Sequence, residues 1–365
     1  MNFKFLFIVM LSVSFCFAQE GAEKKKYTLD ANQFYGSIIL HNPDISHLIT
    51  SHPAGVILSY NRKTYGAEEW EELYNYPDLG YSFIYQNSNN QTLGDAFGLY
   101  AHYNFYFFRR NVQLRVGQGI AYATNPYDKQ TNFRNNAYGS DFLSSTYLMF
   151  NFHKENIVAG LGFKAGISLI HYSNANFRAP NTSTNTLAFN AGFVYDLDGG
   201  KELEYVYREK EKMTEPLRFN LALRSGINES DVIDSGQYGF VVLSAYADKR
   251  LGRKSAIQLG VDAYFSNFLK ELIRFQSIAF PENNVAANDD YKRVGMFIGH
   301  ELFINKLSVI AQLGYYVYYP FDFEGRMYNR IGLKRYFGNK VFGAMTLKSH
   351  GAKAEAVEFG IGIRM

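Results

Sequence analysis

The chain has 365 residues, with 37 lysines and arginines against 34 aspartates and glutamates, and a net charge of +3. This near balance of charge excludes the strongly basic surface that a nucleic-acid-binding protein requires. A single cysteine excludes a disulfide framework and cysteine-ligated zinc. The sequence has no Ser/Pro-rich linker and no repeat of fixed period, so we expect one domain.

Residues 1–18 have the pattern of a cleaved export signal. Lys4 gives a positive start, an apolar core follows, and the segment ends at Ala18. The alternative is lipid attachment at Cys16, which is disfavoured because a bulky phenylalanine stands where a small residue usually precedes a lipidated cysteine. We therefore predict an exported chain whose mature part, residues 19–365, contains no cysteine.

The mature part is rich in aromatic residues and has no apolar run long enough for a spanning helix; the chain contains 29 tyrosines and 32 phenylalanines. Without such helices, a chain crosses a membrane only as a closed β-barrel, because hydrocarbon satisfies no backbone hydrogen bonds. Residues 257–265 alternate apolar side chains with polar or small ones, which is typical of a strand between lipid and a wet interior. Strands of this kind run about ten to thirteen residues here, longer than those of a soluble β-sandwich, which is the alternative.

This alternation predicts an all-β, antiparallel transmembrane barrel of about 14 strands, within an even range of about 12 to 16, that forms one domain. Strands are expected near residues 54–61, 79–87, 92–108, 111–124, 139–152, 157–170, 186–197, 216–228, 237–249, 254–266, 291–304, 306–319, 327–337, 340–349 and 354–365, with a weaker first strand near 35–40. Short helices are expected in the connections near 45–49 and 68–74. If the last strand runs toward the periplasm, the long loops 125–138 and 267–290 lie outside the cell. The charged stretch 198–215 is then a periplasmic strand extension or hairpin.

A short polar segment after the strand near 157–170 is the strongest candidate site. His171 and Ser173 continue the parity of the apolar, lipid-facing side chains of that strand. Polar side chains that face lipid are costly, so their presence at the outer rim indicates either hydration or a function. A neighbouring imidazole can take the proton of a serine hydroxyl and make it a nucleophile for acyl transfer. The alternative is a turn rich in Asn, Ser and Pro that only ends the strand.

The segment His171-Tyr172-Ser173-Asn174-Ala175, followed by Pro180-Asn181, resembles the His-x-Ser-Asn signature of the PagL-type lipid A 3-O-deacylases, which are outer-membrane barrel esterases. The resemblance implies that His171 is the general base, that Ser173 is the nucleophile and that Asn174 helps to form the oxyanion hole. It covers residues 157–197 closely and the remainder only as shared architecture.

The sequence departs from the family pattern at two positions. Asn185 stands where the family usually has the glutamate that orients the histidine, and Asn176 stands where the oxyanion hole usually has glycine. An asparagine carbonyl can hold the imidazole tautomer but supplies no charge for the imidazolium, so we expect a slower esterase. The backbone N–H of Asn176 can still donate, since asparagine enters left-handed conformations readily. Arg178 is expected either to bind a lipid A phosphate or to be a plain rim charge.

Two further groups of polar residues give weaker hypotheses. His41, His47 and His52 could ligate a metal, but their spacing favours a polar plug. Glu355 and Glu358 are expected on opposite faces of the last strand, so they should not share a site. No cofactor or metal motif is present in the sequence.

The sequence therefore predicts an outer-membrane serine esterase that acts on lipid A, the anchor of lipopolysaccharide in the outer leaflet. We expect no cofactor, no metal and no nucleic-acid partner. The alternative is a non-catalytic channel or structural barrel in which interior charges such as Arg115, Arg218 and Arg224 line a pore.

Overall fold

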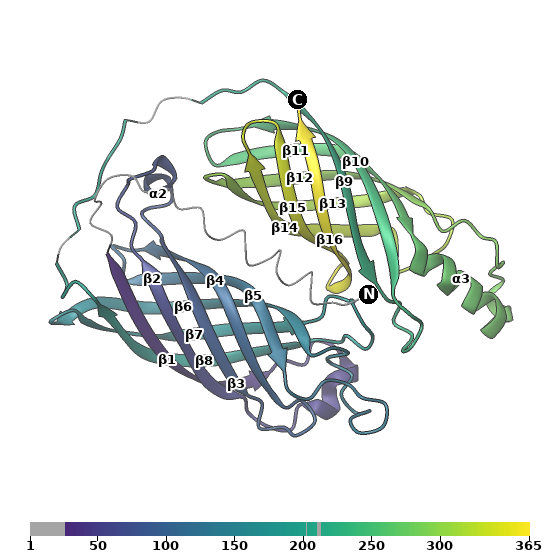
Figure 1. The fold of residues 1–365 in the computed structure, drawn as a ribbon, viewed down its shortest axis with the longest axis horizontal. Coiled ribbons are helices and arrows are strands. Elements are labelled where there is room, and N and C mark those ends of the chain that lie inside the picture. The colour runs from purple at the N-terminus through teal and green to yellow at the C-terminus, as the bar shows by residue number, and fades with distance from the viewer. Residues whose placement is uncertain (1–25, 202, 210–212) are drawn as a thin grey trace.

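The structure is a computed structural model that describes residues 26–201, 203–209 and 213–365. It consists of two closed β-barrels of eight antiparallel strands each, connected between β8 and β9 (Figure 1). Within the described part of the chain, no helix is long and apolar enough to cross a membrane. The predicted signal peptide, residues 1–18, lies outside the described residues.

The first barrel closes where β1 pairs with β8. Four connections, among them those that precede β6 and β8, gather at one end, which is termed the loop end; the opposite end, where β1 begins and β8 ends, is termed the turn end. Its elements are β1 Tyr27–Ile38, η2 Pro43–Leu48, β2 Ala54–Arg62, α2 Glu69–Leu73, β3 Asp78–Asn87, β4 Asp95–Phe107, β5 Val112–Ala123, β6 Phe142–Val158, β7 Leu161–Ser173 and β8 Thr184–Asp196. The helices η2 and α2 confirm the short helices that the sequence predicts near 45–49 and 68–74.

The second barrel closes where β9 pairs with β16. Its turn end has three short turns, and its loop end carries α3, a helix that the sequence did not lead us to expect. The elements are β9 Arg218–Asn228, β10 Tyr238–Arg250, β11 Ser255–Ser266, α3 Asn267–Ala279, η3 Pro281–Asn283, β12 Arg293–Ile304, β13 Leu307–Tyr318, β14 Met327–Phe337, β15 Val341–His350 and β16 Lys353–Arg364. Figure 1 shows the two barrels side by side, with the C-terminus at the turn end of the second.

The prediction of an all-β structure is confirmed, but the strands form two closed barrels of eight and not the single barrel of about 14 strands that the sequence predicts. Tyr35 of β1 pairs with Phe189 of β8, and Leu223 of β9 pairs with Ile361 of β16. In each sheet, the first and last strands therefore form hydrogen bonds with each other, and no edge strand is left unpaired. Alternation along a strand specifies which face meets lipid but not which strands become neighbours, so it does not distinguish one large barrel from two small ones.

The charged stretch 198–215 belongs to the connection between the barrels, and its prediction as a strand extension or hairpin is wrong. Its described residues contact both barrels: Glu215, at its end, pairs with Arg364 of the second barrel at 3.2 Å, and its middle is attached to the first barrel. The Val206 N–H donates to the carbonyl of Tyr65 at 2.8 Å, and the Val206 carbonyl accepts from the hydroxyl of Tyr76 at 2.9 Å. Hydrogen bonds such as these fix the path of the connection along the first barrel. The connection is mostly charged and lacks the composition of a flexible linker.

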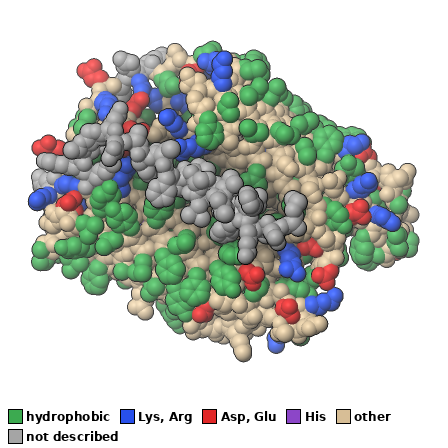
Figure 2. Space-filling view, viewed as in Figure 1, with side chains coloured by type: hydrophobic (Ala, Val, Ile, Leu, Met, Phe, Trp, Pro, Cys, Tyr) green, Lys and Arg blue, Asp and Glu red, His purple; other side chains and the backbone are tan. Residues whose placement is uncertain are grey.

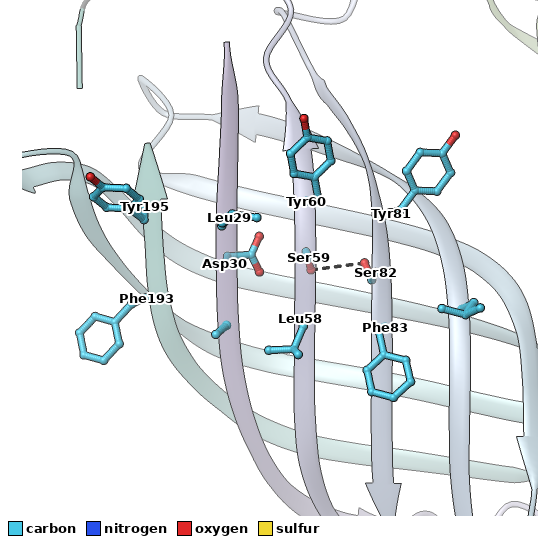
Figure 3. Close-up of a pocket in the computed structure, with 12 residues that line it drawn as sticks. Leu29, Asp30, Leu58, Ser59, Tyr60, Tyr81, Ser82, Phe83, Phe193 and Tyr195 are labelled. Carbon is cyan, nitrogen blue, oxygen red and sulfur yellow. Dashed lines mark hydrogen bonds between the residues drawn. The ribbon is translucent and has the colours of Figure 1, made fainter. Parts of the chain in front are cut away.

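Large apolar side chains cover the outer walls of both barrels. Leu99 on β4, for example, is 70% exposed. Figure 2 shows hydrophobic side chains over the visible walls, with most charged side chains nearer the ends. Figure 3 shows Tyr60, Tyr81 and Tyr195 on the outer wall of the first barrel, where they line a shallow apolar depression near the turn end. An apolar belt with aromatic side chains at its edge is what a lipid-facing barrel requires.

Paired charges fill the interior of the first barrel. The Arg115 guanidinium lies 2.7 Å from the Asp30 carboxylate, and Lys164 Nζ lies 2.9 Å from the same carboxylate. Arg115 is 0% exposed. The channel hypothesis placed this arginine along a pore, whereas the structure buries it against an acidic partner.

The interior of the second barrel is filled in the same way. Arg330 lies 2.9 Å from Asp262 and 2.5 Å from Glu358. Arg224, which the channel hypothesis also placed along a pore, is 2% exposed and lies within 4 Å of both carboxylates, at 3.8 Å and 3.9 Å. Arg218, at the start of β9, is half-buried.

Glu355 faces the barrel interior, and the prediction that it points away from the face of Glu358 is wrong. The register between β15 and β16 shifts next to Lys348, so one extra residue is accommodated on β16. Such a bulge reverses the parity of the residues beyond it. Glu355 accepts from both terminal nitrogens of Arg293, at 3.1 and 2.5 Å, and bonds to His350 Nε2 at 2.7 Å.

Candidate active site

Neighbouring strands at the loop end of the first barrel bring His171 and Asn185 together. They are partners in the register between β7 and β8, and Nδ1 of His171 lies 2.8 Å from Oδ1 of Asn185. Because an amide oxygen only accepts, this hydrogen bond assigns the proton to Nδ1 and leaves Nε2 with a free lone pair. No described residue forms a hydrogen bond with Nε2. The imidazole is therefore oriented and able to accept a proton.

Ser173 ends β7 two residues beyond His171, with the same parity. Its side chain is 6% exposed because the loop that follows β7 covers it. The Ser173 hydroxyl donates to Oδ1 of Asn181 at 3.0 Å and accepts from the N–H of Ala175 at 2.9 Å. Although both residues are described, no hydrogen bond joins Ser173 to His171. The hydroxyl is thus held by the loop and not by the imidazole.

The expected oxyanion donors lie in the same loop. The Asn174 N–H donates to Oδ1 of Asn181 at 2.9 Å, and the Asn176 N–H donates to Oδ1 of Asn174 at 3.1 Å. Asn176 has a φ of 63°, so the left-handed backbone that a glycine would favour is present. Both N–H groups are therefore occupied by side-chain oxygens of this loop in the resting structure.

Arg178 lies on the exposed side of the loop. Its carbonyl accepts from Nδ2 of Asn174 at 2.6 Å, which ties it to the site. Its guanidinium forms no hydrogen bond or ion pair with any described residue. The cation is therefore available to an anionic group that approaches the loop from outside.

The three histidines near the start of the chain are separated rather than clustered. His41 bonds to the carbonyl of Thr182 at 3.0 Å, His47 bonds to the carbonyl of Arg134 at 2.7 Å, and His52 bonds to a serine hydroxyl at 2.8 Å. The described residues contain no group of three His, Cys, Asp or Glu side chains that could hold a metal ion. All three lie in the connection between β1 and β2: His41 and His47 tie it to the two neighbouring loop-end connections, and His52 ties it to β1.

Comparison with protein families divides the chain at the connection between the barrels. Residues 54–194 match the family described as lipid A 3-O-deacylase (PagL), and residues 217–365 match the family described as acyloxyacyl hydrolase, C-terminal domain. The two matches, one for each barrel, are consistent with a PagL-type family. The first match contains His171, Ser173 and Asn185, so the candidate site lies within the deacylase-related barrel.

Other comparisons add little to these two family matches. No curated protein matches the chain. Among solved structures, Pseudomonas aeruginosa OccK2 (OpdF) in complex with glucuronate is 12% identical, with 94% of this chain and 96% of that chain covered and a TM-score of 0.23. Acinetobacter baumannii OccAB3 is 11% identical, with 93% and 98% covered and a TM-score of 0.22. Similarity this low carries no argument about function.

Two residues that contact the candidate site have no role in the sequence interpretation. Asn181 belongs to the recognised segment, but its contact with Ser173 depends on how the loop folds back. Glu229 lies in the second barrel and accepts the N–H of Ala179 at 3.0 Å. No signal in the sequence connects Glu229 to the site, because the contact requires the two barrels to lie side by side.

Proposed function

We propose that this chain is an outer-membrane serine esterase that removes an ester-linked acyl chain from lipid A. The observation that carries the proposal is the 2.8 Å hydrogen bond between His171 and Asn185, which leaves Nε2 free as a base two residues from Ser173. The family match and the apolar outer wall support the same interpretation. The loop end then faces the outside, where acyl chains of the outer leaflet reach the edge of β7.

Catalysis begins with the release of Ser173 from Asn181. The Ser173 hydroxyl and the Asn174 N–H both donate to Oδ1 of Asn181. One rotation of the Asn181 side chain therefore frees the nucleophile and an oxyanion donor together. The same rotation brings the Asn181 amide NH₂, which bonds to no described residue, within the site as a further donor.

The chemical steps follow from the freed groups. Oγ of Ser173 attacks the ester carbonyl carbon, and its proton passes to Nε2 of His171. The Asn174 N–H stabilises the negative charge on the carbonyl oxygen, and the bond between this carbon and the sugar oxygen then breaks. The imidazolium returns its proton to the sugar oxygen. Water attacks the acyl-serine with His171 again as base, which releases the fatty acid and restores the serine.

Arg178 supplies the contact to the head group in this proposal. Lipid A carries phosphates, and a guanidinium binds phosphate through parallel N–H donors. Because the Arg178 guanidinium forms no hydrogen bond or ion pair with the described residues, no such contact must be broken first. A pore-forming function has less support, since Arg115 and Arg224 are buried in charge networks.

The test compares Ser173→Ala with wild type in cells that display the full chain. We expect the deacylated form of lipid A to disappear from the mass spectrum, and the rate of fatty-acid release to fall roughly 10³-fold or more. Ser140→Ala is the matched control, because it removes a loop-end hydroxyl that donates to the Phe142 carbonyl at 2.9 Å. Identical lipid A profiles in wild type and Ser173→Ala would refute the proposal.

A further inference from the structure

The loop that follows Ser173 is attached to the second barrel. The Asn176 side-chain NH₂ donates to the carbonyl of Glu229 at 3.0 Å, and the Glu229 N–H donates back to the carbonyl of Asn176 at 3.1 Å. Nε2 of Gln237 donates to the carbonyl of Phe177 at 2.8 Å. The connection between β9 and β10 thus binds the segment that holds the expected oxyanion donors.

The Glu229 carboxylate is at the centre of this contact. Oε2 accepts the N–H of Ala179 at 3.0 Å, and Oε1 accepts the N–H of Gly236 at 3.1 Å. Glu229 is 3% exposed, and no cation pairs with its carboxylate among the described residues. Burying a carboxylate without a cation costs free energy unless N–H groups donate to it. The N–H groups of Ala179 and Gly236 therefore fix the β7–β8 loop and the β9–β10 loop relative to each other.

The loop needs such an external support because its backbone is irregular. Ala175 and Asn176 both have left-handed φ values, 55° and 63°, and lie outside the β ladder. Oxyanion donors act only when they are held within about 0.5 Å of the productive geometry. Bonds within the loop hold Asn176 to Asn174, whereas the bonds that fix the loop as a whole include those to Glu229.

We propose that Glu229 is a positioning residue for the esterase site of the first barrel, and that the second barrel completes this site. This inference rests on the function proposed above. Glu229 lies outside the segment 54–194 that matches the deacylase family. The second barrel therefore contributes a support that the deacylase-related barrel does not contain, and the ester site of this chain requires both barrels.

A second contact between the barrels, at their turn ends, offers a matched control. The hydroxyl of Tyr74 donates to the carbonyl of Phe303 at 2.8 Å, and Nζ of Lys254 lies 4.6 Å from the centre of the Tyr74 ring. Tyr74→Phe removes the hydrogen bond and keeps the ring. It weakens the association of the barrels without touching the loop after Ser173.

The first arm measures release of fatty acid from purified lipopolysaccharide by the full chain. For Glu229→Ala we expect kcat to fall about 10-fold to 100-fold while KM changes less than about twofold, because the oxyanion donors shift but the lipid surface does not. Glu229→Gln keeps an acceptor for the Ala179 N–H and should recover kcat to within about threefold of wild type. Tyr74→Phe should behave as wild type.

The second arm does not depend on catalysis. Phe177 is 37% exposed, and the mature part expected from the sequence, residues 19–365, contains no cysteine, so Phe177→Cys gives a single thiol on the loop. We expect a maleimide to label this thiol several-fold faster in the Glu229→Ala background and at an unchanged rate in the Glu229→Gln background. If Glu229→Ala does not migrate as a folded barrel in a heat-modifiability gel, Gln237→Ala replaces it and should lower kcat to a smaller extent.

The outcomes separate the two proposals. If wild type releases fatty acid and Glu229→Ala is equally fast, the positioning role is overturned and the esterase stands. If Tyr74→Phe lowers kcat as much as Glu229→Ala does, the effect belongs to barrel association in general, and the specific role of Glu229 is overturned. If wild type releases no fatty acid, the proposed function fails, whatever the labelling rates show about the loop.

Discussion

The hydroxyl of Ser173 lies 3.0 Å from Oδ1 of Asn181, and the same oxygen accepts the N–H of Asn174 at 2.9 Å. A single amide oxygen thus holds the candidate nucleophile and a candidate oxyanion donor in the resting site. His171, whose Nε2 forms no hydrogen bond with a described residue, has the same parity on β7 as Ser173. In the proposed mechanism, the free energy that binds Asn181 to these two donors is part of the activation barrier.

Asn181→Asp should therefore slow the enzyme. The carboxylate keeps both hydrogen bonds and strengthens them, since a charge-assisted hydrogen bond is worth about 1 kcal/mol more than a neutral one. Aspartate also lacks the amide NH₂ that Asn181 can turn toward the oxyanion. We expect kcat for fatty-acid release from lipopolysaccharide to fall at least about fivefold, which is the factor that 1 kcal/mol gives. Asn284→Asp adds the same charge at the loop end of the second barrel and should have no effect, whereas an unchanged kcat for Asn181→Asp would contradict the resting-state role.

Asn185 offers a test in both directions. Asn185→Ala removes the acceptor that holds the proton on Nδ1 of His171, so we expect kcat to fall about 10-fold to 100-fold. Asn185→Glu places a carboxylate beside the imidazole, stabilises the imidazolium that forms during attack, and should raise kcat about tenfold. Both changes in kcat are measured as initial rates of fatty-acid release at saturating lipopolysaccharide. A kcat for Asn185→Ala equal to that of wild type would show that the 2.8 Å hydrogen bond does not orient the base.

The sequence was sufficient to place individual strands and their faces. The period of two along residues 157–170 gives His171 and Ser173 the parity of the lipid-facing side chains, and in the structure Ile167 on that face is exposed while Tyr172 on the other is buried. This works because the side-chain period of a strand is a local property. The register that sets Asn185 opposite His171 follows from the length of the loop and the same parity.

The sequence could not predict which strands close each barrel or how the loops fold back on the site. Eight strands followed by eight strands carry the same alternation as one larger barrel, so nothing local showed that β1 would pair with β8. A bulge near Lys348 turned Glu355 inward and reversed a parity argument that assumed regular pairing. Glu229 reaches the candidate site only across the contact of two separately closed barrels.

Separate closure predicts that the barrels can be destabilised one at a time. Asp30 is buried between Arg115 and Lys164, so Asp30→Ala leaves two cations in the first barrel without their shared carboxylate. Removing one member of a buried ion pair costs about 3–5 kcal/mol. Trp70, the only tryptophan of the chain, packs edge-on against Tyr103 of β4 at 6.2 Å, so its fluorescence follows the packing of α2 against the first barrel.

We expect urea to unfold Asp30→Ala at a lower concentration when Trp70 fluorescence is followed, with the free energy of unfolding of the first barrel reduced by about 3–5 kcal/mol. Asp248→Ala is the matched control in the second barrel, where Asp248 accepts from Arg364 and Asn220 at 2.6 Å each. It should leave the Trp70 transition in place and shift only the remaining loss of β-structure seen by circular dichroism. If Asp248→Ala moved the Trp70 transition as far as Asp30→Ala does, the two barrels would unfold as one unit, and the prediction of separate unfolding would be wrong.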